Sequence, residues 1–518
     1  MPDLSALLMG QVFGRLSLVS SLTLVSRFLG LARDVMFFGC FGASIIGEAF
    51  ILAFTFPNLF RRMLGEGTLS SAFIPIFTDT LKRESKEKAL LLLSNLVSRL
   101  FLFLGLLAII VILFCYFGST SFGLEQGKWT SGLYLNSVSF GYVVFICISA
   151  ILVGALNSNG SFFEGAFSPV LLNLCMIGSM FLGKFIWGLS GMDLAVLLCL
   201  SVIFAGFLQL LLPWVSLRKS MGWEWQVKIS ESDGINQIKS LFWVGAMGAA
   251  VGQVNILVSR FLAYSLDESG GLSYLFLSSR LVELPLGVFA IAISTVFFPE
   301  MSRAISSGEN MRFKKSVLSG LIMTAGITIP AAAGLAILAE PILTALFQWK
   351  EFGAENVSGA KEILVISSLG LPFYAISTFL VKVFHSQKNM RIPLNAAICS
   401  LIANIVLSLI LISDYQAHGL AWANVLAAVM QTLYLALKLN VLPLRQLGRQ
   451  VFSILLSTGI MTGVLFYSDH FFSFENSKFG CAIYLLCVIP VGALTFGVGF
   501  FFFGSEEIKK MVKKVFQK

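Results

Sequence analysis

The sequence predicts an all-α polytopic membrane protein, and three observations lead to this fold class. The chain of 518 residues is 57% hydrophobic and only 12% charged, with a mean hydropathy of +0.87, whereas soluble domains carry about 25% charged residues. Apolar runs of about 20 residues recur from end to end and leave no stretch for a separate soluble domain. The runs are continuous rather than alternating, which excludes a transmembrane β-barrel.

Fourteen apolar runs predict membrane spans. The segment 68–80, TLSSAFIPIFTDT, follows the second of them, is too short to span and contains Pro75, so we expect an interfacial or re-entrant piece. The predicted spans cover residues 16–36, 43–64, 89–117, 131–157, 167–188, 192–216, 238–263, 272–299, 316–338, 361–384, 392–413, 418–439, 451–468 and 480–503.

The basic residues predict the orientation of the chain. Loops after even-numbered spans, together with the C-terminal tail, hold about four times as many Lys and Arg residues as the opposite loops, which include Lys128, Lys350 and Lys478. By the positive-inside rule, this asymmetry places both termini in the cytoplasm. It also explains the net charge of +9 better than nucleic-acid binding does, so no nucleic-acid partner is expected.

Several kinds of chemistry have no support in the residues. The eight Cys residues lie singly in apolar segments and the three His residues stand in no metal-binding spacing, so we expect no metal site and no cofactor. A membrane-bound transferase would need clustered His or Asp residues, and no G-x-x-x-x-G-K-S/T loop for ATP occurs. The N-terminus lacks the basic start of a cleavable signal peptide. These patterns favour a transporter over an enzyme.

Charged residues interrupt the first predicted span at SRFLGLARDV, residues 26–35. A charged side chain at mid-bilayer costs about 2.5–3.5 kcal/mol, so it commonly marks a substrate pathway. Arg27, Gly30 and Asp34 follow the i, i+3, i+7 spacing of one helical face, with Arg33 offset from it. This span therefore presents two candidate cations beside one carboxylate.

Further charges fall within other predicted spans. In the second span, Arg62 and Glu66 are four residues apart and can pair, which leaves Arg61 without an obvious local partner. In the eighth span, Arg280 and Glu283 are three residues apart and share a face. The supporting polar residues of these regions are Glu48 and Asn58 in the second span and Asn255 in the seventh.

These charges have both structural and functional explanations. Arg33, Arg61 and Arg62 could snorkel to lipid headgroups, and Arg280 with Glu283 could form a purely structural pair. A water-filled central cavity would instead accommodate all of the cations at once. Because the arginine fork matches phosphate oxygens bidentately, such a cavity would bind an anionic ligand. An exporter of organic cations would need an acidic cavity instead.

Two segments of the chain resemble each other. The stretch from Ala49, AFILAFTFPNLFRRMLGEGTLSSAFIPIF, and the stretch from Ser273, SYLFLSSRLVELPLGVFAIAISTVFFPEM, share their length, a polar cluster in mid-helix and a terminal Phe next to or near Pro. The second begins six spans after the first, as expected for repeated halves around a central site. Shared composition is the alternative explanation.

The N-terminal pattern SRFLGLARD, FGAS and EAFILAFTFPNLFRRMLGEGTLSSAFIPIF resembles the MurJ (MviN) family of lipid II flippases, and the resemblance continues in SSRLVELPLGVFAIAISTVFFPEMSR. It implies the MOP-type fold related to multidrug exporters, with a six-helix bundle over residues 1–220 and a second over 221–440. Residues 441–518 would add two spans that form a lipid groove, followed by a basic cytoplasmic tail.

The same resemblance implies a substrate and a location. The substrate would be lipid II, an undecaprenyl-pyrophosphate-linked disaccharide-pentapeptide, moved by alternating access from the cytoplasmic to the outer leaflet for peptidoglycan synthesis. The protein would reside in the bacterial cytoplasmic (inner) membrane, among membrane lipids and other peptidoglycan synthesis proteins as partners. A MOP-type exporter of another lipid-linked oligosaccharide or of small organic substrates is the alternative.

The family's functional arginines fall on four positions of this sequence. The motif around SRFLGLARD places two of them on Arg27 and Arg33, PNLFRRMLGEG places one on Arg61, and the eighth span places one on Arg280. The resemblance implies that these residues bind the pyrophosphate of the substrate.

The chain also departs from its relatives at several positions. Glu48 stands where many relatives have Asp, and Ser279 precedes Arg280 where Asp is common. Some relatives carry acidic residues suited to a coordinated cation in the seventh and eleventh spans, and the matching positions here are Ser259 and Ser408. The loss of these carboxylates puts a bound sodium ion in doubt.

Overall fold

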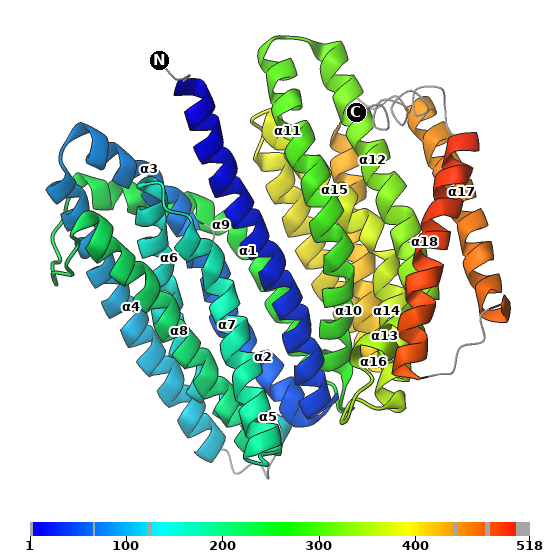
Figure 1. Ribbon diagram of the computed structural model, residues 1–518, viewed down its shortest axis with the longest axis horizontal. Coiled ribbons are helices and arrows are strands. Elements are labelled where there is room, and N and C mark those ends of the chain that lie inside the picture. The colour runs from blue at the N-terminus through cyan, green and yellow to red at the C-terminus, as the bar shows by residue number, and fades with distance from the viewer. Residues whose placement is uncertain (1–3, 66–67, 122–126, 440–443, 472–476, 504–518) are drawn as a thin grey trace. The chain divides into compact units, whose positions relative to one another are not determined.

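The computed structural model describes residues 4–65, 68–121, 127–439, 444–471 and 477–503, and these ranges are almost entirely helical (Figure 1). Within them no β-strand occurs, and Trp349 and Phe352 form an isolated β-bridge. The all-α fold class predicted from the apolar runs is confirmed.

The helices follow one another with short connections. Three π-helical turns, η1 to η3, continue helices α2, α7 and α10. In chain order the elements are α1 (Leu4–Phe41), α2 (Ile45–Phe60), η1 (Arg61–Gly65), α3 (Thr68–Arg83), α4 (Lys86–Ser121), α5 (Lys128–Ser139), α6 (Tyr142–Ser158), α7 (Phe163–Phe181), η2 (Leu182–Ile186), α8 (Gly191–Met221), α9 (Asp233–Tyr264), α10 (Gly271–Pro285), η3 (Leu286–Ala290), α11 (Ile291–Ser306), α12 (Asn310–Ile337), α13 (Ala339–Phe347), α14 (Ala354–Leu369), α15 (Leu371–Ser386), α16 (Arg391–Lys438), α17 (Leu444–Phe471) and α18 (Lys478–Phe503).

Helices lie over all fourteen predicted spans, and α16 contains two of them separated by a break at Gln416 (φ 46°, ψ −128°). Length and apolar composition select nine stretches of the described residues as able to cross a membrane, or ten if the bent pair α5 and α6 counts as one span. One reason for the lower number is that α2 has only 16 residues. The chain is therefore a multi-pass membrane protein, while the count of fourteen stays a prediction.

The segment after the second predicted span forms a helix of its own. α3 runs through Pro75 from Thr68 to Arg83. Leu69, Phe73 and Phe77 repeat every four residues along it and are buried, which is the pattern of a helix with one packed face. This face lies against α4 and α6. The interfacial or re-entrant placement of α3 stays a prediction.

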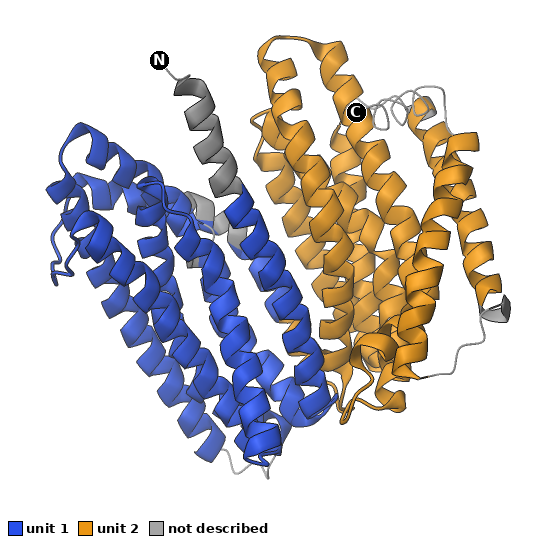
Figure 2. Ribbon diagram, in the orientation of Figure 1, with its two compact units in different colours: residues 1–257 blue, residues 258–518 orange. Residues whose placement is uncertain are grey.

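The chain divides into two compact units (Figure 2). Unit 1 comprises residues 1–257 and unit 2 comprises residues 258–518, so the boundary falls inside α9 rather than between helices. Unit 2 includes α17 and α18, which pack against α12 and α13. The predicted division at residues 220 and 440, with two separate C-terminal spans, stays a prediction.

Aromatic side chains and one glutamine hold the core of unit 1 together. Phe50 of α2 lies 5.5 Å, between ring centroids, from Phe37 of α1, and Phe54 lies 6.3 Å from Tyr142 of α6. The Tyr142 hydroxyl donates to Oε1 of Gln209 on α8 at 3.2 Å, and Gln209 Nε2 donates to a backbone oxygen of α7 at 2.7 Å. Since a buried amide without partners is costly, this network fixes α6, α7 and α8 in one arrangement.

A buried ion pair fixes the start of α2. Ser44 caps the helix by accepting a hydrogen bond from the backbone N–H of Gly47. One turn into the helix, the Glu48 carboxylate is fully buried and lies 2.8 Å from Nζ of Lys128, the first residue of α5. The Lys128 side chain is only 13% exposed. Each of these buried charges is therefore stabilised by the other.

The crossover segment, residues 222–232, joins α8 to α9 and is bound along its length to α4. It begins where Gly222 takes a left-handed conformation (φ 66°) that ends α8. The indole N–H of Trp223 donates to Ser94 Oγ at 2.9 Å, and that of Trp225 donates to Ser98 Oγ at 3.0 Å. Two indoles therefore anchor the first half of the segment to one face of α4.

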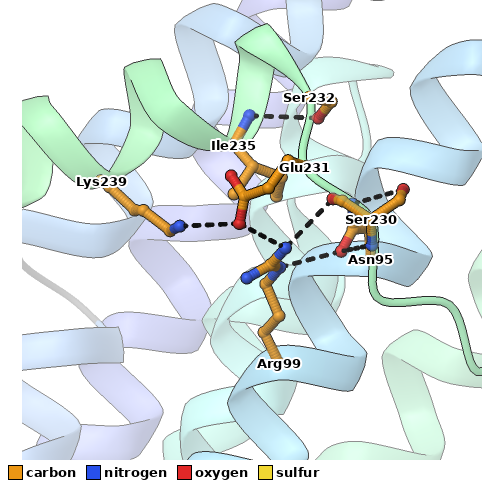
Figure 3. Close-up of polar contacts among 7 residues, drawn as sticks. All are labelled: Asn95, Arg99, Ser230, Glu231, Ser232, Ile235 and Lys239. Atoms are coloured by element: carbon orange, nitrogen blue, oxygen red, sulfur yellow. Dashed lines mark hydrogen bonds and ion pairs between the residues drawn. The ribbon is translucent and has the colours of Figure 1, made fainter.

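Polar and charged contacts anchor the second half of the crossover segment (Figure 3). Asn95 Nδ2 donates to the backbone oxygen of Ser230 at 2.6 Å, and Arg99 donates both to this oxygen at 3.1 Å and to Glu231 Oε1 at 3.0 Å. Lys239 of α9 lies 3.3 Å from the same carboxylate oxygen. Hydrogen bonds from Lys239 and Arg99 lower the pKa of Glu231. The first turns of α9 are thus linked to α4 within unit 1.

The core of unit 2 is built around α12, α15 and α16. The fully buried Phe379 of α15 packs beside Gly320 of α12 and meets Phe297 of α11 edge to face at 6.3 Å. A second, smaller cluster joins α17 to α18 through Leu465, Tyr484 and Val488. The Tyr484 hydroxyl lies 2.8 Å from Ser468 Oγ. A hydrogen bond therefore also joins α17 and α18.

Replacing Gly206 by Ala should lower the thermal unfolding midpoint of the purified protein. Gly206 of α8 faces Tyr142, and a Cβ there would lie 2.6 Å from Cδ2 of this ring; overpacking of this kind costs about 1–3 kcal/mol. Gly105 of α4 is the matched control, because a Cβ there meets no atom within 4 Å and Ala is favoured over Gly in helices by about 1 kcal/mol. An unchanged midpoint for Gly206→Ala would contradict the packing described.

Removing either charge of the Glu48–Lys128 pair should destabilise the protein, because the remaining charge stays buried. We expect Glu48→Gln to cost about 3–5 kcal/mol and the double variant Glu48→Gln/Lys128→Met to recover much of this loss in thermal or denaturant unfolding. Lys88→Met is the control, since its pair with Glu84 is exposed and such pairs contribute about 0–1 kcal/mol. Equal losses for Lys88→Met and Glu48→Gln would contradict the buried pair.

Candidate functional site

Arg61 and Arg62 lie in the π-helical turn η1, directly after α2. The Arg61 Nε–H donates to Oδ1 of Asn58 at 2.9 Å, so these two predicted residues are in contact. Arg62, like Arg61, is half-buried. π-helical turns are rare and occur preferentially at functional sites, which is consistent with a role for this turn beyond packing.

The two similar sequence segments also match in structure. η1 follows the 16-residue α2 and itself contains Arg61 and Arg62, and η3 follows the 15-residue α10, which contains Arg280 and Glu283. The helices beyond them, α3 and α11, both have 16 residues. Since composition alone does not require a π-helical turn at the same place, the match favours the interpretation as repeated halves.

Arg27 lies on an exposed face of α1. Among the residues that the structure describes, its guanidinium makes no hydrogen bond or ion pair. It stands 14 residues before the end of α1 at Phe41, which corresponds to about 21 Å of helix in a bilayer whose apolar core is about 30 Å thick. The Arg27 side chain is thus exposed, and its position at membrane depth stays a prediction.

Arg33 has a different environment from Arg27. Its Nη2 lies 2.6 Å from Asp34 Oδ1, and its Nη1 donates to Oδ1 of Asn173 on α7 at 3.1 Å. Asn173 Nδ2 in turn donates to the backbone oxygen of Ser26 at 3.1 Å. The Arg33 side chain is only 12% exposed. The structure therefore brings Arg33 and Asp34 together and ties both to α7.

The remaining predicted residues of unit 1 lie on different elements. Glu48 pairs with Lys128 at the start of α2 and is inaccessible to a ligand. Asn255 is half-buried on α9. Glu66 lies outside the described residues, so its predicted pairing with Arg62 stays a prediction.

In unit 2, Arg280 lies among three neighbours on α9 and α10. Its Nη1 is 3.3 Å from Oε2 of Glu283, which confirms the predicted contact between them, and its side chain is 30% exposed. The guanidinium carbon lies 4.9 Å from the ring centroid of Phe276, one turn earlier on α10, and that of Arg260 on α9 lies 5.3 Å from the same centroid. Guanidinium groups over aromatic rings are stabilised by cation–π attraction.

Ser259 of α9 and Ser408 of α16 belong to a neutral hydrogen-bond network. Asn404 Nδ2 donates to Ser259 Oγ at 2.9 Å and to Asn424 Oδ1 at 3.3 Å, and Ser408 Oγ donates to Asn404 Oδ1 at 3.3 Å. Asn424 Nδ2 donates to the backbone oxygen of Leu420 at 2.9 Å. These residues join α9 to both halves of α16. The network has no carboxylate, and its amide N–H groups and oxygens bond to one another, so it does not fit a sodium ion.

The sequence analysis did not identify two residues that contact the predicted arginines. Asn173 is a lone amide in the apolar run VLLNLCMIG, and Phe276 is one apolar residue among many in its helix. The polar residue in an apolar run is a usable signal for the first, whereas nothing in the sequence distinguishes Phe276 from a lipid-facing side chain.

Comparison with known proteins identifies the family. The family model described as lipid II flippase MurJ matches residues 39–486. A probable lipid II flippase MurJ of Bdellovibrio bacteriovorus is 32% identical over 427 residues, covering 81% of this chain and 80% of the relative. That of Vibrio cholerae is 31% identical over 478 residues, covering 87% of this chain and 88% of the relative.

Solved structures agree with the sequence comparison. A lipid II flippase MurJ in an inward closed conformation aligns with a TM-score of 0.80 at 27% identity, over 94% of this chain and 98% of that one. An inward-facing multidrug resistance transporter of the MATE family in the MOP superfamily aligns with a TM-score of 0.65 at 13% identity, over 81% and 97% of the chains, and shows the shared fold alone. The chain belongs to the lipid II flippase MurJ family.

Proposed function

We propose that this chain is a flippase that moves lipid II from the cytoplasmic to the outer leaflet of the bacterial inner membrane by alternating access. In this proposal Arg27, Arg61 and Arg280 bind the pyrophosphate, and Arg33 takes part through the network that ties α1 to α7. Family membership supports the substrate and the activity. The orientation with both termini in the cytoplasm rests on the loop charges.

The observation that carries the arginine assignment is the environment of Arg27. A guanidinium at membrane depth costs about 2.5–3.5 kcal/mol, and cation–π contacts or carboxylates offset this cost elsewhere in the chain. For Arg27 the described residues provide no hydrogen bond or ion pair, although its side chain is exposed. An anionic substrate supplies the missing partner, and a pyrophosphate supplies oxygens in the geometry that the arginine fork prefers.

We further propose that α17 and α18 form an apolar groove for the isoprenoid tail. Between Ser453 and Phe503 no arginine occurs, and the one lysine, Lys478, begins α18. Large apolar side chains on both helices are strongly exposed, among them Phe452 (68%), Phe466 (75%) and Leu494 (69%). A long polyprenyl chain needs a surface of this kind and has no use for charged residues.

Replacing Arg27, Arg61 or Arg280 by Ala should each abolish lipid II transport while the protein still inserts. Truncating one partner of a desolvated charge pair costs about 2–5 kcal/mol, so we expect the rate in reconstituted vesicles to fall at least about 30-fold. Lys at the same positions keeps the charge but loses the fork, so it should retain partial activity. Arg83→Ala is the control, since Arg83 is 80% exposed. Wild-type transport by Arg27→Ala would refute the assignment.

Transport should not depend strictly on sodium. The network of Ser259, Asn404, Ser408 and Asn424 offers neutral groups that bond to each other, whereas a cation buried in the membrane requires oxygen ligands that balance its charge. The membrane potential acts directly on the arginines proposed to bind the substrate, at about 2.3 kcal/mol per charge per 100 mV. Replacing sodium by choline at a clamped potential should leave flipping largely intact, and a severe loss would contradict the neutral network.

A further inference from the structure

Two arginines from different helices of unit 2 share one aromatic ring. The guanidinium carbons of Arg260 and Arg280 lie 5.3 Å and 4.9 Å from the ring centroid of Phe276. Because both distances end at the same point, the two carbons are at most about 10 Å apart, within the range of a cation–π cluster. Both side chains are half-buried rather than sealed in the core, so a ligand can reach them.

The ring has a defined place between the two cations. Phe276 and Arg280 are four residues apart on α10 and lie on one helical face, on which Glu283 follows. Arg260 approaches from α9 and directly follows Ser259, which the hydrogen bond from Asn404 fixes against α16. The backbone that carries Arg260 is therefore held in place, as a preorganised anion site requires.

The two arginines stand at different distances from the turn that joins α9 to α10. Arg260 is four residues before the end of α9 at Tyr264, and Arg280 is nine residues after the start of α10 at Gly271. At 1.5 Å of rise per residue, they lie about 6 Å and about 14 Å from the turn that joins the helices. In the proposed orientation this turn faces the outer side, so Arg260 is the outer of the two.

We propose that Arg260 is a further substrate-binding residue, which holds the second phosphate of the pyrophosphate above Arg280 on the way to the outer leaflet. This role rests on the proposed function and deepens it, because it explains why the anion does not lose all of its partners as it leaves Arg280. Two like charges near one ring repel each other, and an anion with a phosphate for each guanidinium removes this repulsion. A single phosphate cannot serve both arginines as well.

The test compares Arg260→Met, Arg260→Lys and Arg280→Ala in the full-length protein in lipid nanodiscs. Met keeps an apolar chain of similar length and a favourable sulfur–aromatic contact with Phe276, so it removes the charge while preserving the packing. Binding of inorganic pyrophosphate and of inorganic phosphate is measured as the shift of the unfolding midpoint with ligand concentration. Arg312→Met is the control, because Arg312 is exposed on α12.

We expect Arg260→Met to weaken pyrophosphate binding at least ten-fold and phosphate binding less than three-fold, with Arg260→Lys in between. Arg280→Ala should weaken both. Lipid II transport should fall at least ten-fold in Arg260→Met and stay at the wild-type level in Arg312→Met.

Different failures have different meanings. Wild-type pyrophosphate binding and transport in Arg260→Met, together with impaired Arg280→Ala, would overturn the role of Arg260 and leave the proposed function standing. Equal losses in Arg260→Met and Arg260→Lys, with lowered midpoints before any ligand is added, would assign Arg260 to packing and also overturn the proposal. If the wild-type protein moves no lipid II, the proposed function itself is wrong, whatever pyrophosphate binding shows.

Discussion

The cost of holding a guanidinium within a membrane governs the placement of the unusual residues in this chain. Each membrane-embedded arginine has to recover about 2.5–3.5 kcal/mol, and the protein does this in several ways. Arg33 lies against Asp34 and Asn173, Arg61 donates to Asn58, and Arg280 combines a carboxylate with an aromatic ring. Arg27 has no such contact among the described residues, which is why it points most directly to a bound anion.

The same electrostatic constraint applies to the neutral hydrogen-bond network between α9 and α16. A cavity lined by cations alone would repel a positively charged drug and attract a phosphate. A sodium ion beside Arg260 would be repelled by its guanidinium. Ser259, Asn404 and Asn424 join α9 to α16 by hydrogen bonds without any charge. In unit 1, the crossover segment holds the other end of α9 to α4 through Asn95 and Arg99. α9 is thus fastened to a different set of helices at each end.

Apolar runs and loop charges were sufficient to predict the fold class and the positions of the helices, because burial in lipid requires long continuous apolar helices with satisfied backbones. The local contacts Arg280–Glu283 and Arg61–Asn58 follow from helical spacing, so they can be predicted from the sequence. Partners such as Asn173 for Arg33, or Lys128 for Glu48, are far apart in the chain. Such pairs depend on helix packing, which periodicity does not encode.

The π-helical turns were also beyond prediction. A turn such as η1 shifts the helical register by one residue, and this changes the face on which Arg61 and Arg62 lie without any marker in RRMLG. The broken helix of α5 and α6, bent by 43°, has no Pro at its bend, and so the apolar run reads as one straight span. Of these local irregularities, η1 carries Arg61 and Arg62 and η3 follows Arg280 and Glu283.

The central claim is that the arginines are held in the membrane because they bind the pyrophosphate. The most direct measurement is transport by the wild-type protein of two synthetic lipids that share the polyprenyl tail and the sugar-peptide head and differ only in their linkage, one a pyrophosphate and one an uncharged spacer. The account predicts rapid appearance of the pyrophosphate lipid in the opposite leaflet of reconstituted vesicles and no transport of the uncharged lipid above protein-free vesicles. Equal transport of both lipids would contradict it.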